Sequence, residues 1–354
     1  MVVSRVRPKR AVRVPPLVAA AVLVGVVLAD GGEARAGKND LELLSLCPRT
    51  SGECDWVQRN GAGAVTGVDV KAPYQEQFRS LMSELGVVVA PRLQTPADTL
   101  GYSGFQFSFE MGFTKVNSAQ PYWNAVSGTP ATGSTAASHR PDTYLTTIGG
   151  FVRKGIWLPL PAFEVGAGAV HVMSSNMYAV QGYAKLALQE GFHGWWLPSV
   201  AVRGAASQLL GTEQVDLTVY GVDVLISKAF GLGGMFRLEP FAGWNLLFID
   251  AASGALDATP GCDAFAASQS PGGTAKCGPT SMDANAFFAF PQQDVITRQR
   301  LSGGFKLKWA VLFVVAQYDL IPAGRSHNSR AGAAPVRDTS QQQQSFSLSA
   351  GLDF

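Results

Sequence analysis

The chain has 354 residues, of which 47% are hydrophobic and 15% are charged. This composition excludes a disordered chain, which would be rich in charge and poor in apolar residues. A bundle of membrane-spanning helices is excluded too, because no apolar run after the first 30 residues approaches about 18 residues. Residues 1–36 carry 6 of the 28 Lys and Arg and 2 of the 26 Asp and Glu, which leaves 22 basic and 24 acidic residues. This balance predicts no nucleic-acid partner.

Residues 1–36 have the pattern of a secretory signal peptide. Basic residues between Arg5 and Arg13 precede an apolar stretch over 17–28, and Ala34-Arg35-Ala36 offers small residues for cleavage. The alternative is a short uncleaved membrane anchor. Both predict export.

Four cysteines suit an oxidising compartment. Cys47 lies close to Cys54 in sequence, and Cys262 lies close to Cys277. Of the three possible connectivities, this local pairing needs no long-range folding information. A zinc site is the alternative, but the sequence has no Cys-x-x-Cys motif and no neighbouring histidine. We therefore predict two disulfides, with no metal and no cofactor.

The segment 37–104 contains one predicted helix, over 74–86. Pro73 suits a helix start, and Gly86 suits a helix end. Apolar residues recur between them at helical spacing: Phe78, Leu81, Met82 and Leu85. Residues 86–89 could then form a strand.

From residue 105 onward, apolar and polar residues alternate, which predicts β-strands. The pattern is clearest at 105–113 and 344–354, and eight further segments lie between: 144–154, 162–173, 177–189, 197–208, 215–229, 234–250, 295–308 and 311–320. Most exceed the usual strand of about 5–6 residues in a soluble sheet. Tilted strands that cross a bilayer need about this greater length.

The connections between these segments alternate in length. The long ones, 115–143, 251–294 and 321–343, are all odd-numbered when counted from residue 105, and all the even-numbered ones are short. An up-and-down barrel has short periplasmic turns and longer outer loops. The sequence therefore predicts an all-β, antiparallel, up-and-down transmembrane β-barrel.

Charged residues decide which face of each strand points inward. Within 295–308, Arg298, Arg300 and Lys306 share one parity, and Leu301 and Phe305 share the other. A slip by one residue would turn the cations toward lipid. The same alternation predicts these lumen-lining residues: Glu110, Glu164, Lys185, Arg203, Asp223, Arg237, Glu239, Arg298, Arg300, Lys306 and Asp319.

The signal peptide, the alternating strands and the apolar residues at every second position before Phe354 resemble bacterial outer-membrane β-barrel proteins as a class. The resemblance covers about 105–354 and implies contact with outer-membrane lipid. It also implies a last strand, 344–354, that the barrel-assembly machinery reads at these positions: Phe346, Leu348, Leu352 and Phe354.

We predict ten wall strands, because a strand at 86–89 would make eleven and bacterial single-chain barrels are even-numbered. Twelve strands, with another near Ala286–Phe290, is the alternative. The segment 37–104 is then either periplasmic or a plug in the lumen. Ten strands tilted by about 40° enclose a backbone radius of roughly 10 Å, which inward side chains mostly fill.

We therefore expect a narrow or gated channel for small solutes. One alternative is a structural or surface-interaction barrel that displays its outer loops, and another is a FadL-like transporter of hydrophobic molecules. Enzymatic activity is not expected, since His139, His171, His193 and His327 are scattered. His139 and Asp142 share an outer loop, but no other residue supports a catalytic pair.

Overall fold

The computed structural model describes residues 37–48, 54–61, 65–129, 138–156, 162–191, 197–232, 235–259, 286–328 and 335–354. The predicted signal peptide, the pair Cys262 and Cys277, and His193 lie outside these residues. Among the described residues, no helix is long and apolar enough to cross a membrane.

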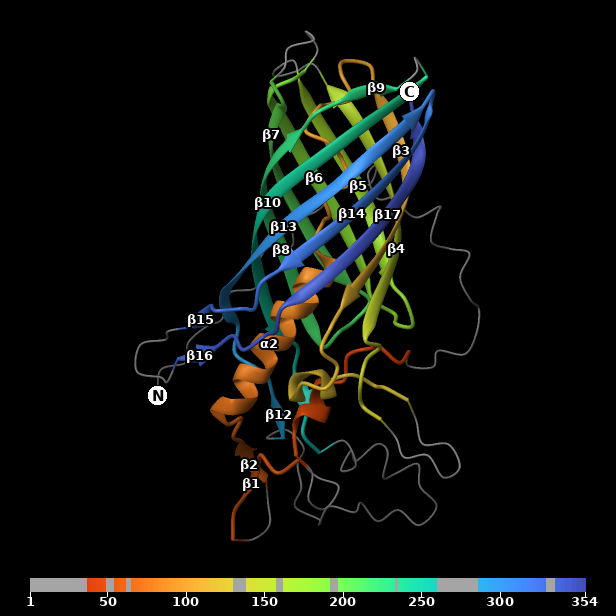
Figure 1. The fold of residues 1–354 in the computed structure, drawn as a ribbon. Helices are drawn as coiled ribbons and strands as arrows, with labels where there is room; N and C mark the ends of the chain where they lie inside the picture. The colour runs from red at the N-terminus through yellow and green to blue at the C-terminus, as the bar shows by residue number, and fades with distance from the viewer. Residues whose placement is uncertain are drawn as a thin grey trace. The chain divides into compact units, whose positions relative to one another are not determined.

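Ten antiparallel strands close into a barrel (Figure 1). Their order is β13-β14-β17-β3-β4-β5-β6-β7-β8-β10, and β10 pairs with β13 to complete the ring. The strands are β3 (Phe105–Lys115), β4 (Tyr144–Ile156), β5 (Phe163–Val172), β6 (Tyr178–Gln189), β7 (Ser199–Leu210), β8 (Val215–Ser227), β10 (Phe236–Ser253), β13 (Gln293–Trp309), β14 (Leu312–Ile321) and β17 (Gln343–Asp353). The short β9 (Phe230–Leu232) pairs with the first residues of β10.

The prediction of ten strands is confirmed, and the alternative of twelve is wrong. Residues Phe287–Phe288 form a short strand, β12, but it pairs with β11 (Leu256–Asp257) in a separate two-stranded sheet. This sheet follows the end of β10 and precedes β13, so it belongs to a loop and adds nothing to the wall.

The wall strands alternate between a buried polar face and an exposed apolar face. In β17, Ser345, Ser347 and Ser349 are buried, whereas Phe346 and Leu348 are 43% and 40% exposed. A barrel surrounded by water would turn its apolar face inward, because burying apolar surface away from water is favourable. The reverse arrangement suits a wall in contact with lipid, where a closed sheet also pairs every wall strand with two neighbours.

The two ends of the barrel differ. The end at which the connections 116–143, 254–292 and 322–342 emerge is called the loop end here, and the opposite end is called the turn end. Several small elements belong to residues 37–71 and to the loop-end connections: η1 (Leu43–Leu46), β1 (Val57–Arg59), β2 (Val65–Val68), η2 (Pro121–Asn124), β15 (His327–Asn328) and β16 (Val336–Arg337). At the turn end, Phe105 and Phe354 exchange two backbone hydrogen bonds of 3.0 and 2.8 Å.

The helix in the N-terminal segment, α2 (Ala72–Val89), is longer than predicted. Gly86 does not end it, and residues 86–89, for which a strand was the alternative, are the last residues of the helix. A Cβ atom at Gly86 would lie 2.7 Å from Ile249 Cδ1, so this glycine permits close packing of α2 on β10. The helix ends at Ala90 because Pro91 follows, and the residue before a proline is disfavoured in the helical conformation.

Candidate functional site: the occupied lumen

Residues 89–100, from the last residue of α2 onward, run lengthwise through the barrel and are called the occupying segment here (Figure 1). Near the loop end, the carbonyl of Val89 accepts hydrogen bonds from Gln181 Nε2 at 2.7 Å and from Ser207 Oγ at 2.8 Å. Near the turn end, the amide of Thr99 donates to Glu190 Oε1 at 2.8 Å. Gln181 lies in the first half of β6 and Glu190 directly follows its last residue, so the segment spans nearly the length of that strand.

Cationic side chains of the wall bind the carbonyl oxygens of this segment. Arg203 donates to the carbonyl of Arg92 at 2.8 Å, and Arg300 donates to that of Pro91 at 2.5 Å. Lys185 Nζ donates to the carbonyls of Pro96 and Asp98, at 3.1 and 2.9 Å. Charge-assisted hydrogen bonds of this kind are stronger than neutral ones.

Wall side chains also accept hydrogen bonds from the backbone amides of the segment. Gln94 N donates to Gln317 Oε1 at 2.7 Å, and Ala97 N donates to Ser227 Oγ at 3.0 Å. Pro91 and Pro96 have no N–H, which lowers the number of donors that need a partner inside the barrel. Gln94 has a φ of 43°, an uncommon value for a residue with a side chain.

Ion pairs within the wall hold the cations in place; three of them join neighbouring strands, and Lys306–Asp353 reaches from β13 across β14 to β17. Arg153 pairs with Glu110, Lys185 with Glu164 at 3.1 Å, Arg203 with Asp223 at 2.6 Å, and Lys306 with Asp353 at 2.7 Å. All eight side chains are buried or nearly so. A buried charge is tolerated when it is paired and its remaining polar atoms are hydrogen-bonded, and here the N-terminal segment supplies several of those bonds.

The structure buries all the residues predicted to line the lumen except Arg237, whose side chain is 46% exposed. Their contacts differ from those expected of a solute pathway. Lys185, Arg203 and Arg300 bind the backbone of the occupying segment, and Arg298 binds Ser83 of α2 at 2.9 Å. The polar lumen therefore binds part of its own chain.

Sequence reasoning missed several residues of this site. Arg153, Gln181, Ser207 and Gln317 have the inward parity of their strands, so the same alternation would have identified them. The residues of the occupying segment itself, such as Arg92, have no period of two and gave no comparable signal.

At the loop end, Glu84 of α2 ties the helix to two connections. Its carboxylate accepts hydrogen bonds from Tyr122 Oη at 2.5 Å, Trp123 Nε1 at 2.7 Å and Gln341 N at 2.8 Å. Burial raises the pKa of the Glu84 carboxyl above its ordinary value, although these three hydrogen bonds act in the opposite direction. The helix is thus fixed to η2 and to the chain just before β17.

The residues before α2 cover the loop end. Lys38 Nζ lies 2.5 Å from Asp142 Oδ1, and Leu43 N donates to Gln214 Oε1 at 2.7 Å. The ring of Trp56 packs against those of Phe288 and Phe290, with centroids 5.4 and 6.1 Å apart. These contacts bind the N-terminal residues to the described parts of the connections 116–143, 211–214 and 254–292, and together these residues are called the packed cap here.

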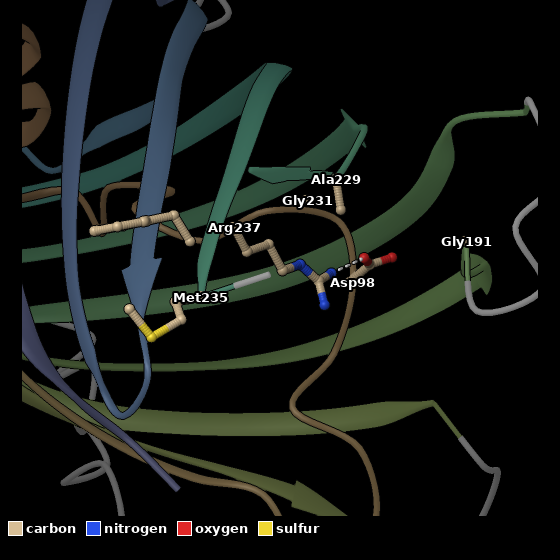
Figure 2. Close-up of a pocket in the computed structure, with 7 residues that line it drawn as sticks. Asp98, Gly191, Ala229, Gly231, Met235 and Arg237 are labelled. Carbon is tan, nitrogen blue, oxygen red and sulfur yellow. Dashed lines mark hydrogen bonds and ion pairs between the residues drawn. The ribbon is translucent and has the colours of Figure 1, made fainter. Parts of the chain in front are cut away.

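A cavity of about 450 Å³ opens at the turn end, where the occupying segment leaves the lumen (Figure 2). Figure 2 shows the Arg237 guanidinium pointing toward Asp98, the last charged residue of that segment. The two side chains form an ion pair of 2.9 Å, and Arg237 also lies 3.2 Å from Glu239. Met235 and Phe236 add apolar surface to the cavity.

The remaining site predictions concern cysteines and histidines. Cys47 and Cys54 form a disulfide. Asp142 is engaged by Lys38 and Asn39, whereas His139 Nδ1 lies 3.3 Å from the carbonyl of Val126. Within the described ranges, no group of three or more His, Cys, Asp or Glu side chains is placed to hold a metal ion.

A closed antiparallel barrel with an apolar outer face and a polar, ion-paired lumen defines the bacterial outer-membrane type of β-barrel. A scan against protein-family models finds no match, and a search of curated protein sequences finds no relative.

A search of solved structures finds distant resemblances. The attachment invasion locus protein Ail of Yersinia pestis is 9% identical, with 72% of this chain and 99% of that chain covered and a TM-score of 0.25. Neisserial surface protein A is 10% identical, with 70% and 95% covered and a TM-score of 0.25. LpxR from Salmonella typhimurium is 9% identical, with 69% and 99% covered and a TM-score of 0.30. The class assignment rests on the geometry of the chain itself.

Proposed function

We propose that this outer-membrane barrel is closed to solutes by its own N-terminal segment and acts through the packed cap at its loop end, as a surface-interaction protein. The observation that carries the proposal is the occupied lumen. The backbone of residues 89–100 is hydrogen-bonded by side chains from β6, β7, β8, β13 and β14. Displacing it would leave several buried charges without these partners, which is costly.

The cap supports a role outside the barrel. Long outer loops without such contacts would be mobile, but here the N-terminal residues bind several of them together. Asp40 accepts hydrogen bonds from the backbone and the side chain of Asn176, at 2.6 and 2.9 Å. A preorganised surface loses less conformational entropy when a partner binds.

The proposed orientation places the loop end outside the cell, because outer-membrane barrels have their longer loops there. The segment 37–71 is then also outside, and residues 89–104 return the chain through the lumen to the start of β3. The opposite orientation would place residues 37–71 in the periplasm.

Cysteine labelling on intact cells tests this arrangement. We expect a membrane-impermeant maleimide to label Gln58→Cys in β1 and to leave Met235→Cys at the turn end unlabelled until the cells are broken. Both positions are exposed, so they form a matched pair. If only Met235→Cys were labelled on intact cells, the orientation would be the opposite of the proposed one, and the surface role would be wrong.

Bilayer recordings test the closure. The refolded full chain should show no stepwise conductance for small solutes. Regular openings of the unmodified chain would contradict a closed barrel and favour a channel.

A gated conduit for small solutes is the second candidate. It is favoured by the cavity at the turn end, where Arg237 and Asp98 form a partly exposed ion pair beside open space. If this pair is a latch, Asp98→Asn should produce openings in bilayer recordings, and a silent Asp98→Asn variant would count against gating. The ion-paired lumen argues against passage of hydrophobic molecules.

A further inference from the structure

The two sides of the lumen wall differ in how they contact the occupying segment. On the side of β6, β7 and β8, the wall binds the segment directly through Gln181, Ser207, Arg203 and Ser227. The inner face of β17 instead presents small hydroxyl groups: Ser345, Ser347 and Ser349, all buried. Serines occupy less of the lumen than the arginines and glutamines on the other side.

Buried polar atoms without a partner follow this inner face of β17. Among the residues that the structure describes, Gln343 Oε1, Ser347 Oγ and Ser349 Oγ have no hydrogen-bond partner. The same holds for Asp319 Oδ2, and Asp319 lies directly opposite Ser345 in the pairing of β14 with β17. These atoms extend from the first residue of β17 to the seventh, and Asp353, which pairs with Lys306, continues the line to the turn end.

The occupying segment contributes unpartnered atoms to the same region. Both amide atoms of the Gln94 side chain and the hydroxyl of Thr95 have no partner within the described part of the chain, and both residues are at least nine-tenths buried. The backbone of Gln94 is bonded to Gln317, and Gln317 lies opposite Ser347 in the sheet. Gln94 is therefore next to the serine row.

An unpaired polar group inside a protein is costly, and ordered water is its usual partner when protein atoms do not supply one. A single such atom carries little weight, but here Ser347 and Ser349 are successive inward residues of β17, and Gln94 lies on the chain opposite. Gln343 and Asp319 lie next to Ser345, which bonds Thr114 at 3.1 Å. We propose that a file of water molecules lies between the inner face of β17 and residues 94–95, and that the barrel, closed to larger solutes, remains permeable to water along it.

The proposal rests on the occupied lumen and is independent of the surface role. The test measures the osmotic shrinkage of lipid vesicles that contain the refolded full chain, by stopped-flow light scattering. These vesicles should shrink faster than protein-free vesicles. Ser347→Leu fills the row with an apolar side chain, so its vesicles should shrink at the protein-free rate.

Ala350→Leu is the matched control, because Ala350 is on the same strand and faces outward. Its vesicles should shrink as fast as those of the unmodified chain. Ser349→Val, a smaller change with the same expected loss, serves if Ser347→Leu does not assemble. The proposal is overturned if vesicles with the unmodified chain shrink no faster than protein-free vesicles. It is also overturned if vesicles with the folded serine variants shrink as fast as those with the unmodified chain. Neither outcome would affect the labelling of Gln58→Cys, so failure of this inference and failure of the surface role remain distinguishable.

Discussion

Arg203 and Asp223 lie directly opposite one another on β7 and β8, and Arg203 Nε donates to Asp223 Oδ2 at 2.6 Å. Both side chains are at most 1% exposed. The pair orients the guanidinium so that its Nη1 donates to the carbonyl oxygens of Arg92 and Leu93. An ion pair within the wall thus positions the group that holds the occupying segment.

The first prediction concerns this pair. Asp223→Asn should lower the free energy of unfolding by about 3–5 kcal/mol, because it leaves the buried Arg203 charge without compensation. Denaturant unfolding of the refolded protein measures the change. Asp142→Asn breaks the partly exposed pair with Lys38 and should cost at most about 1 kcal/mol. Equal losses in the two variants would contradict the account.

The second prediction concerns the packing of α2. Gly86→Val should destabilise the protein by about 1–3 kcal/mol, because its Cβ would overlap Ile249 and force α2 away from β10. Thermal unfolding measures the loss. Gly67→Val, in β2, is the control, since a Cβ at Gly67 meets no atom within 4 Å. A Gly86→Val variant with the same thermal stability as the unmodified chain would show that α2 does not pack this closely on β10.

The third prediction concerns pH. Burial raises the pKa of Glu84 above its ordinary value of 4.5, so the folded state holds this proton more tightly than the unfolded state. The stability contributed by the protonated carboxyl is complete below pH 4.5 and falls as the pH rises through the folded-state pKa.

The comparison of the unmodified chain with Glu84→Gln isolates this effect, because Gln does not titrate. The unfolding free energy of the unmodified chain minus that of the variant should decrease as the pH rises above 4.5. Unfolding curves at a series of pH values measure it, and a difference that increases with pH would mean that the hydrogen bonds from Tyr122, Trp123 and Gln341 outweigh burial.

The fourth prediction concerns the lipid-facing surface. Val222 is 46% exposed near the middle of β8, and Leu210 is 48% exposed at the loop end of β7. Val222→Arg should cost about 2–4 kcal/mol and Leu210→Arg about 0–1 kcal/mol, because a charge is least tolerated at the bilayer midplane. Unfolding from lipid vesicles measures both. Equal costs would argue against a membrane around the barrel.

The strands, their number and their inward faces could be predicted because a period of two is a local property of the chain. The parity that buries Arg298 and Lys306 also exposes Leu301 and Phe305, and it can be recognised without knowing which strands pair. The alternation of long and short connections also predicted the up-and-down order of the strands.

The occupied lumen could not be predicted in the same way. The bond between Val89 and Gln181 joins residues 92 positions apart, and that between Gln94 and Gln317 joins residues 223 apart. Such contacts exist only after the ring has closed around residues 89–100, and those residues have no periodic pattern that marks them as its contents.

The sequence by itself determined a barrel with a polar interior, since alternation forces opposite surroundings on successive side chains. Only the tertiary structure decided what fills that interior. Lys185, Arg203 and Arg300 bind backbone carbonyl oxygens of residues 89–100, and any sequence could supply carbonyl oxygens.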